Sequence, residues 1–313
     1  MCQSVSSLRR FMTGRADKME FLHYPVMHEE VLENLTLPAD RPSVLIDCTT
    51  GEGGHTKLFL DKYPLLTVFG LDRDSEIQKK AIERMKEYGE RFRPVNTWFN
   101  DYLSERDTES ADAILFDLGI SIFHYEESER GFSFRKDEEL DMRLDTSQSL
   151  SAETIVNEYG EEALADVIYK YGEERYSRRI ARAVCEKRRE KRIRTSRELA
   201  DIIWSCVPRE YRYGHLHPAT RTFQALRIEV NRELDRIEPA LTEALRVLNR
   251  GGRVAVITFH SLEDRIVKWT FKDREQKYGD IRILTKKPIV PSDKECDENP
   301  PSRSSKLRIV EKL

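Results

Sequence analysis

Residues 44–55 read VLIDCTTGEGGH, and this stretch decides the fold. The apolar run 44–46 is typical of a buried parallel strand. The glycines that follow allow the backbone to turn sharply and to approach a ligand closely. A helix starting near Thr56 would point its positive N-terminus at the same place. The stretch therefore predicts a strand, a glycine-rich turn and a helix at the edge of an α/β sheet.

A second strand is predicted at 66–71, and it runs directly into Asp72. This carboxylate stands nineteen positions after Gly53, a spacing at which an acid can accept hydrogen bonds from ribose hydroxyls. The loop and Asp72 together predict a cofactor that contains a nucleoside, bound at the carboxyl edge of the sheet.

The spacing of the glycines bears on which nucleoside cofactor binds. The dinucleotide fingerprint is G-x-G-x-x-G, but no glycine stands three positions after Gly53. Asp47 and Glu52 flank the loop, which suits a cationic sulfonium amino acid better than a pyrophosphate. The pattern resembles the S-adenosylmethionine-binding half of Rossmann-like methyltransferases. A dinucleotide, as in an NAD dehydrogenase, and a tight turn without a ligand remain the alternatives.

Length, composition and charge exclude several further classes of protein. The 313 residues predict about two domains. No apolar run approaches the ~18 residues of a membrane span. The five cysteines are odd in number and lack a C-x-x-C pair, which favours a reducing, cytoplasmic setting and argues against disulfides or zinc. No spacing of His, Cys and Asp implies a metal. The net charge of −3 means that any nucleic-acid contact must come from a local patch.

Strands alternate with helical segments along much of the chain, which predicts an α/β sheet. The first five strands are expected at 44–48, 66–71, 93–98, 112–118 and 253–259, and a C-terminal antiparallel hairpin at 281–284 and 307–310. Residues 120–252 separate the fourth and fifth strands, far more than one crossover helix needs. One long helix over 219–248 would supply the crossover, so roughly one hundred residues must form an inserted domain.

The insert is expected to be helical. Ser151 can cap a helix that runs through Ile155 to Ile168, and Thr195 with Glu198 forms a capping box. The segment 175–197 carries eleven Lys or Arg and two Glu. It predicts either a solvated helix face or a surface that binds nucleic-acid phosphates. The expected division is a disordered tail over 1–20, a methyltransferase core over 21–125 and 216–313, and an RNA-binding or substrate domain over 126–215.

Five stretches combine polar residues with sharp turns, and two of them are long and unusual: HPATRTFQALRI at 217–228 and FHSLEDRIVK at 259–268. The others are 23–31, 117–121, and 130–134 with 140–143. Together they resemble the RsmH (MraW) family over nearly the whole chain. The resemblance implies a Rossmann-like S-adenosylmethionine-dependent methyltransferase with an inserted helical domain. It also implies a substrate, N4 of a cytosine in the decoding centre of 16S ribosomal RNA within the small subunit.

The resemblance also assigns cofactor roles. Gly53, Gly54 and His55 would line the methionine part, as part of a loop that begins at Gly51. Asp72 would take the ribose hydroxyls, and Phe99 would lie against the adenine. Asp117 would lie near the methionine amino group and the transferring methyl. The family usually has a glutamine in an S-S-x-Q pattern where this chain has His124. A histidine can replace one amide hydrogen bond but not both.

Methylation of a cytosine amine requires acceptors for its protons and an in-line approach to the methyl group. The expected catalytic residues are Asp117, Leu118, Ser121 and His260. Phe132 or Phe134 could stack on an unstacked base or could belong to the core. Asp264 and Arg265 could instead pair with each other as scaffold. The expected substrate residues are Asp141, Arg143, Arg221, Ser261, Asp264 and Arg265, with Glu263 beside them.

Two further functions compete with this interpretation. A DNA cytosine-N4 methyltransferase would share the cofactor half, but it carries a D/N/S-P-P-Y/F motif where this chain has residues 117–120, DLGI. A ribosome-assembly factor that binds RNA without catalysis is favoured by the altered stretch 121–124 and disfavoured by the intact glycine loop. A homodimer is a further prediction from the sequence.

Overall fold

The computed structural model describes residues 25–313, so the predicted tail over 1–20 lies outside the described residues. A seven-stranded sheet has the order β3-β2-β1-β4-β5-β7-β6. β7 is antiparallel to β5 and β6, and the remaining pairs are parallel. The predicted Rossmann-like sheet with a C-terminal antiparallel pair is confirmed. The strands are β1 (Ser43–Asp47), β2 (Leu66–Asp72), β3 (Phe92–Asn96), β4 (Ala111–Asp117), β5 (Leu248–Thr258), β6 (Ile281–Ile283) and β7 (Lys306–Lys312).

The strand order reverses at β1, which lies between β2 and β4. Leu45 of β1 is paired with Val68 on one side and with Ala113 on the other. Because the three strands are parallel, their carboxyl ends meet at one edge of the sheet. This switch point is where open α/β sheets bind ligands.

Helices cover both faces of the sheet. Alternate side chains along β1 and β4 enter different cores, as the period of two in a strand requires. Leu45 packs in the core beneath α1 and α2, whereas Ile46 packs in the core beneath α4, α12 and α13. The helices are α1 (His28–Asn34), α2 (Gly54–Lys62), α3 (Ser75–Arg84), the 3-10 helix η1 (Lys86–Arg91), α4 (Phe99–Glu105), α12 (Glu233–Val247) and α13 (Ser261–Tyr278).

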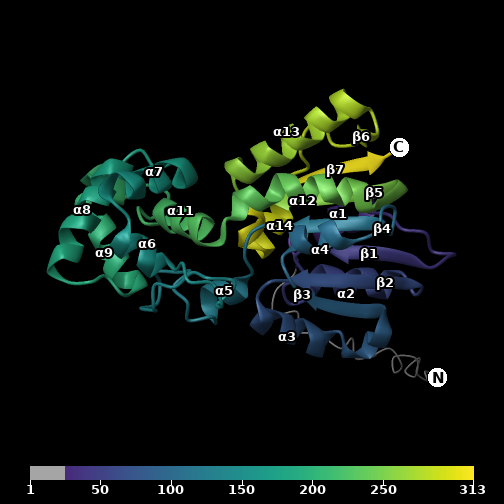
Figure 1. Ribbon diagram of the computed structural model, residues 1–313, viewed down its shortest axis with the longest axis horizontal. Helices are drawn as coiled ribbons and strands as arrows, with labels where there is room; N and C mark the ends of the chain where they lie inside the picture. The colour runs from purple at the N-terminus through teal and green to yellow at the C-terminus, as the bar shows by residue number, and fades with distance from the viewer. Residues whose placement is uncertain (1–24) are drawn as a thin grey trace, which may run out of the picture.

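The segment between β4 and α12 forms a helical lobe beside the sheet (Figure 1). It has a buried core of its own, to which Ile155, Ile180 and Leu199 contribute. Ser151 caps α6 by accepting from the Thr154 backbone N–H, and the predicted Thr195 capping box is present. The helices are α5 (Ile122–Glu126), α6 (Ala152–Glu158), α7 (Glu161–Gly172), α8 (Ser177–Glu190), α9 (Ser196–Cys206), α10 (Arg209–Arg212) and α11 (Thr220–Asn231).

Two predicted helices are each divided in the structure. The helix expected from Ser151 through Ile168 breaks at 159–160, where the backbone is extended. The single crossover helix over 219–248 is also wrong, because Arg232 adopts a left-handed conformation with φ 51° and separates α11 from α12.

The break at Arg232 separates two packing environments. Phe223 of α11 packs in the core of the helical lobe, whereas Leu241 of α12 packs against the sheet. The predicted boundary between insert and core at 215–216 stays a prediction. By its packing, α11 belongs with the insert.

Two short helices, α14 (Asp293–Glu298) and the 3-10 helix η2 (Pro300–Ser304), connect β6 to β7. Within residues 25–313, no helix combines the length and the apolar character needed to cross a membrane.

Candidate functional site

A cavity opens at the carboxyl edge of the sheet, where β1, β2 and β4 end. Most of the predicted catalytic and cofactor residues line it: Gly51, Gly54, His55, Asp72, Phe99, Asp117, Leu118, Ser121 and His124. Gly53 is not in the lining; it caps α2 with φ 84°, and a Cβ there would lie 3.1 Å from the Met85 side chain. The predicted cofactor residues therefore converge on one hollow.

Two carboxylates, the buried Asp47 and the half-buried Asp72, fix the glycine loop and the start of α2 to the strands. Gly51, with φ 54°, donates its backbone N–H to Asp72 Oδ2 over 2.9 Å. Asp47 accepts from Thr56 Oγ1 over 2.7 Å and does not line the cavity. Burial raises the pKa of Asp47. Asp47 therefore fixes the start of α2 to β1, whereas the sequence suggested that it flanks the ligand.

Asp72 ends β2 with both carboxylate oxygens engaged by the backbone. Oδ2 accepts from Gly51, and Oδ1 accepts from the Asp74 N–H over 2.8 Å. Each oxygen keeps a second lone pair, so the pair can still accept two hydroxyl protons. Burial raises the pKa of Asp72 to about 6, although these backbone hydrogen bonds and His124 lower it.

His124 belongs to a buried charged network beside Asp72. Its Nε2 lies 3.0 Å from Asp74 Oδ2, and Arg130 donates to the same oxygen. Burial opposes ionisation, but hydrogen bonds from His124 and Arg130 lower the pKa of Asp74 to about 2. His124 Nδ1 is buried and has no hydrogen-bond partner within residues 25–313. A cavity-lining histidine with one committed and one unpaired nitrogen can offer a single hydrogen bond to a ligand.

Asp117 and His55 form a second polar group at the end of β4. Asp117 Oδ2 lies 3.5 Å from His55 Nε2, and the Asp117 backbone N–H donates to Thr49 Oγ1 over 2.7 Å. Asp117 Oδ1 and both ring nitrogens of His55 are buried without hydrogen-bond partners among the described residues. Buried polar atoms are rarely left unpaired, so this group indicates a polar ligand in the cavity.

Aromatic rings form another part of the wall. Phe99 begins α4 and meets Phe116 edge-on, with ring centroids 5.5 Å apart. Trp98 precedes it, and the Arg236 guanidinium lies 4.0 Å from the Trp98 ring centroid. Trp98 and Arg236 line the cavity but were not among the predicted site residues. Trp98 was detectable next to Phe99, whereas Arg236 reaches the site only through the packing of α12.

None of the six expected substrate residues lines the cavity, and all six are engaged in contacts elsewhere. Asp141 and Arg143 pair with each other, with Nε and Oδ1 2.7 Å apart. Asp264 pairs with Arg308 of β7, with Nε and Oδ1 2.7 Å apart. The alternative that Asp264 pairs with Arg265 is therefore wrong, and substrate roles for these residues stay predictions.

Arg221, Ser261 and Arg265 all meet one glutamate, Glu173, which ends α7 with φ 48°. Ser261 Oγ donates to Glu173 Oε2 over 2.7 Å, and Arg265 lies 3.3 Å from Oε1. Arg221 donates to the Glu173 carbonyl over 2.9 Å. This contact joins the helical lobe to α13, so the three residues lie at the junction of insert and sheet.

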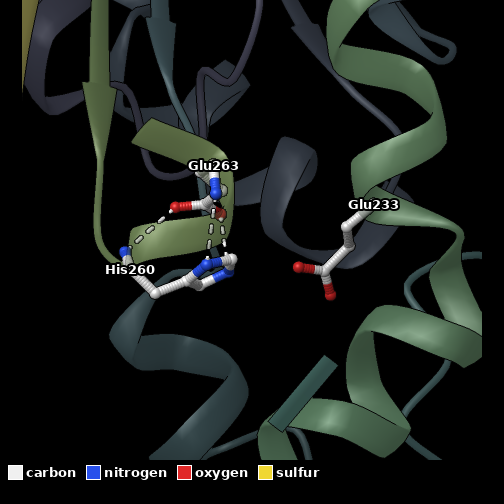
Figure 2. A group of neighbouring side chains, drawn as sticks. All are labelled: Glu233, His260 and Glu263. Carbon is white, nitrogen blue, oxygen red and sulfur yellow. Dashed lines mark hydrogen bonds and ion pairs between the residues drawn. The ribbon is translucent and has the colours of Figure 1, made fainter. Parts of the chain in front are cut away.

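His260 stands beside the cavity as the N-cap of α13 and forms a capping box with Glu263. Glu263 is 1% exposed and, with Glu233, lines the cavity. Burial raises the pKa of Glu263, but His260 and Arg227 more than offset it and hold that pKa below its usual value. Figure 2 shows Glu233 facing the His260–Glu263 pair from α12. Glu233 was not predicted, because nothing in the sequence links the start of α12 to the start of α13.

The basic segment forms α8 and its flanks on the helical lobe. Arg178, Arg179 and Arg189 are exposed and have no ion pair among the described residues, whereas Arg182 and Lys187 pair with glutamates. The outer face therefore keeps free positive charge.

The two phenylalanines considered for base stacking are packed. Phe132 is 4% exposed and meets the His124 ring edge-on, with centroids 5.2 Å apart. Phe134 is stacked on His217, with centroids 4.5 Å apart. Both belong to or pack against the core of the helical lobe, so neither offers a free ring face of the kind the sequence suggested.

The sheet order has an antiparallel seventh strand, and the switch-point cavity joins an acid at the end of β2 to unpaired polar groups at the start of α2 and the end of β4. These features define a Rossmann-like methyltransferase. Residues 20–313 match the family model described as the MraW methylase family, and the chain belongs to this family. The family predicted from the sequence is confirmed, and with it an S-adenosylmethionine-dependent methyltransferase.

Relatives align over nearly their whole length. The ribosomal RNA small subunit methyltransferase H of Treponema denticola is 48% identical over 311 residues, covering 94% of this chain and 98% of the relative. The protein of the same name from Sulfurihydrogenibium sp. is 48% identical over 295 residues, covering 93% and 99%. Among solved structures, an rRNA methylase from Streptococcus thermophilus aligns with a TM-score of 0.38 and 12% identity, over 91% of this chain and 93% of that one.

The cavity fits S-adenosylmethionine on the chemistry of its own groups. The Asp117–His55 group, with unpaired polar atoms, suits the amino-acid part. Asp72 keeps free lone pairs for ribose hydroxyls, and Phe99 offers a ring to the adenine. The individual cofactor contacts stay predictions.

Proposed function

We propose that the protein transfers a methyl group to N4 of cytosine 1402 in the decoding centre of 16S ribosomal RNA, acting on the small ribosomal subunit. Two relatives that are 48% identical to this chain carry the name ribosomal RNA small subunit methyltransferase H. Since those alignments extend over more than nine-tenths of each chain, the same substrate class is the best supported one.

The observation that carries the chemistry is the state of Asp117. Its Oδ1 is buried at the carboxyl end of β4, beside the Leu118 backbone, and has no donor within residues 25–313. S-adenosylmethionine supplies an electrophilic sulfonium methyl group when it is bound. The protein must then hold a cytosine amine, whose lone pair is delocalised, in line with that methyl and accept its protons.

Asp117 and the Leu118 carbonyl are the proposed acceptors of the two amine protons. Transfer would form the N4–C bond while the bond from the methyl group to the sulfonium sulfur breaks, with S-adenosylhomocysteine as the leaving product; the amine proton would pass to the Asp117 carboxylate and from there to solvent. His55 keeps the carboxylate oriented through its contact with Oδ2. Asp72, Phe99 and Gly51 line the cavity and would hold the nucleoside end of the cofactor.

The helical lobe is the proposed RNA-binding part. Its exposed arginines on α8 can neutralise phosphates without reading sequence. The target base must leave its stack to reach the cavity, which is easiest in a single-stranded or loosely paired region.

We infer a cytoplasmic location, because the four cysteines in the described part of the chain are free thiols and the substrate is the ribosome. A homodimer stays a prediction.

The test uses small subunits from a strain that lacks the endogenous methyltransferase. They are incubated with this protein and labelled S-adenosylmethionine, and the product is mapped by nuclease digestion and mass spectrometry. Label on N4 of the decoding-centre cytosine is expected. Asp117→Asn should lower kcat by about 10²–10³-fold, whereas Asp107→Asn, an exposed acid before β4, should behave as wild type.

The outcomes separate the competing functions. Cofactor binding without transfer to this cytosine would contradict the proposed substrate and favour another nucleic acid. Absence of both binding and transfer would favour an RNA-binding assembly factor.

A further inference from the structure

Three potential metal ligands meet at the wall of the cavity from two helices that are distant in sequence. Glu233 begins α12, His260 caps α13, and Glu263 lies in the first turn of α13. One ligand atom from each lies within 4.8 Å of the others, and the side chains face a common space (Figure 2). Glu233 and Glu263 also line the cavity, so the group borders the proposed reaction site.

The cluster carries surplus negative charge in a buried setting. Arg227 donates to both oxygens of Glu233, over 2.8 and 2.9 Å, and is itself 9% exposed. Two carboxylates therefore share one guanidinium, which leaves about one negative charge when His260 is neutral. Buried charges are normally paired or bound to a metal, so the excess negative charge favours the binding of a cation. Each Glu233 oxygen keeps a second lone pair after Arg227 is satisfied.

His260 contributes an independent observation. Its Nε2 is buried and makes no hydrogen bond in the described chain, although it lies 3.2 Å from Glu263 Oε1. The other ring nitrogen, Nδ1, accepts the Glu263 N–H over 3.4 Å, a long contact. The capping box accounts for Nδ1 and for Glu263 Oε2, and Arg227 occupies one lone pair on each Glu233 oxygen, but neither gives Nε2 a hydrogen-bond partner among the described residues.

We propose that Glu233, His260 and Glu263 bind a divalent cation that accepts mixed nitrogen and oxygen ligands, such as Mn²⁺ or Zn²⁺. Ligands at about 2.1 Å from one ion lie no more than about 4.2 Å apart, so three ligand atoms that lie within 4.8 Å of one another need to approach by at most about 0.6 Å. A neutral imidazole has a single ring proton, so binding of the ion through Nε2 places that proton on Nδ1, and the long contact from the Glu263 N–H to Nδ1 is given up. The remaining coordination positions face the cavity, where an oxygen of the nucleotide would complete the shell; this last point rests on the proposed function.

The test titrates the full chain with Mn²⁺ in the absence of S-adenosylmethionine and RNA, and follows free Mn²⁺ by electron paramagnetic resonance. One ion per chain is expected, with a nitrogen coupling in the bound spectrum. Glu233→Gln and His260→Asn should each weaken binding at least about tenfold. Asparagine is a good N-cap, so His260→Asn keeps the start of α13. The matched control is Glu238→Gln, an exposed acid on α12, which should bind as wild type.

The proposal is overturned if wild type binds no Mn²⁺ at millimolar concentration, or if both variants bind as wild type. It is also overturned if the nitrogen coupling survives in His260→Asn, which decides the matter even if Glu233→Gln proves unstable in thermal unfolding. Failure here is distinct from failure of the proposed function: methyl transfer without Mn²⁺ binding removes only the cation site, and Mn²⁺ binding without transfer removes only the function.

Discussion

Asp72 makes cofactor binding dependent on pH in a range where few other carboxyl groups titrate. Burial raises its pKa to about 6 in the cofactor-free protein. The ionised form has lone pairs for two ribose hydroxyls; the protonated form replaces one acceptor by a donor. The backbone N–H groups of Gly51 and Asp74 both donate to the Asp72 carboxylate, so protonation of Asp72 would also weaken one of these hydrogen bonds. Binding should therefore select the ionised form.

The size and the sign of the effect follow from that pKa. Because the pKa is raised, the neutral acid persists to higher pH than usual, and affinity should fall as pH falls through 6. About nine-tenths of the protein is ionised at pH 7 and about one-tenth at pH 5, if the hydroxyl donors keep the bound carboxylate ionised throughout. The dissociation constant for S-adenosylhomocysteine should thus rise about tenfold, or about 1.4 kcal/mol.

Isothermal titration calorimetry at half-unit steps between pH 5 and 7 measures this change. Asp72→Asn mimics the protonated acid, so it should bind weakly at every pH and show a flat profile. A flat profile in wild type would refute the reasoning, because the carboxylate would then be ionised throughout or uninvolved. The same tenfold slope in Asp72→Asn would assign the titration to another group.

Three further outcomes are expected. Phe99→Leu keeps an apolar side chain but removes the ring, so calorimetry should show S-adenosylhomocysteine binding weaker by about 1–3 kcal/mol, and a change below about fivefold would argue against adenine stacking. Thr195→Ala removes the acceptor for the Glu198 N–H and should lower the free energy of unfolding by about 1 kcal/mol in urea titrations, without changing cofactor affinity. Charge reversal at Arg178 and Arg179 should weaken binding to small subunits and flatten its dependence on salt in filter-binding assays; unchanged salt dependence would move the RNA contact away from α8.

The sequence predicted the parts of this protein that depend on local pattern. The strand, glycine loop and Asp72 at the end of β2 follow from a short apolar run, a turn and a fixed spacing, and the structure brings them to one cavity. The Thr195 capping box follows from residues three apart. Local rules of this kind do not require knowledge of how distant segments pack.

The residues that the sequence did not find depend on long-range packing. Arg236 and Glu233 reach the cavity only because α12 lies across the sheet, and no spacing along the chain announces this. Arg130 reaches Asp74 across 56 positions, from a loop of the insert. Conversely, Ser261 and Arg265 look like site residues because they follow a strand, but they face Glu173 at the junction of the two lobes.

The break between α11 and α12 connects these observations. A continuous helix would satisfy the sequence periodicity, but it could not pack on two cores at once. Arg232 therefore takes a left-handed conformation, which costs a non-glycine residue on the order of 1 kcal/mol. The buried Asn231 side chain compensates by donating to the Met142 and Arg227 carbonyls, over 2.8 and 2.9 Å, which fastens the end of α11 to the insert.

The same turn sets the chemistry of the cavity wall. Because α12 restarts immediately after Arg232, its first residue, Glu233, stands where the insert meets the sheet and opposite the start of α13. Arg227, one turn before the break, holds the Glu233 carboxylate through two hydrogen bonds. A rotation of the insert about this joint would move Arg227 relative to Glu263 and alter the charge balance beside the methyl acceptor. The position of the proposed RNA-binding lobe and the charge balance beside the proposed reaction site therefore both depend on this two-helix junction.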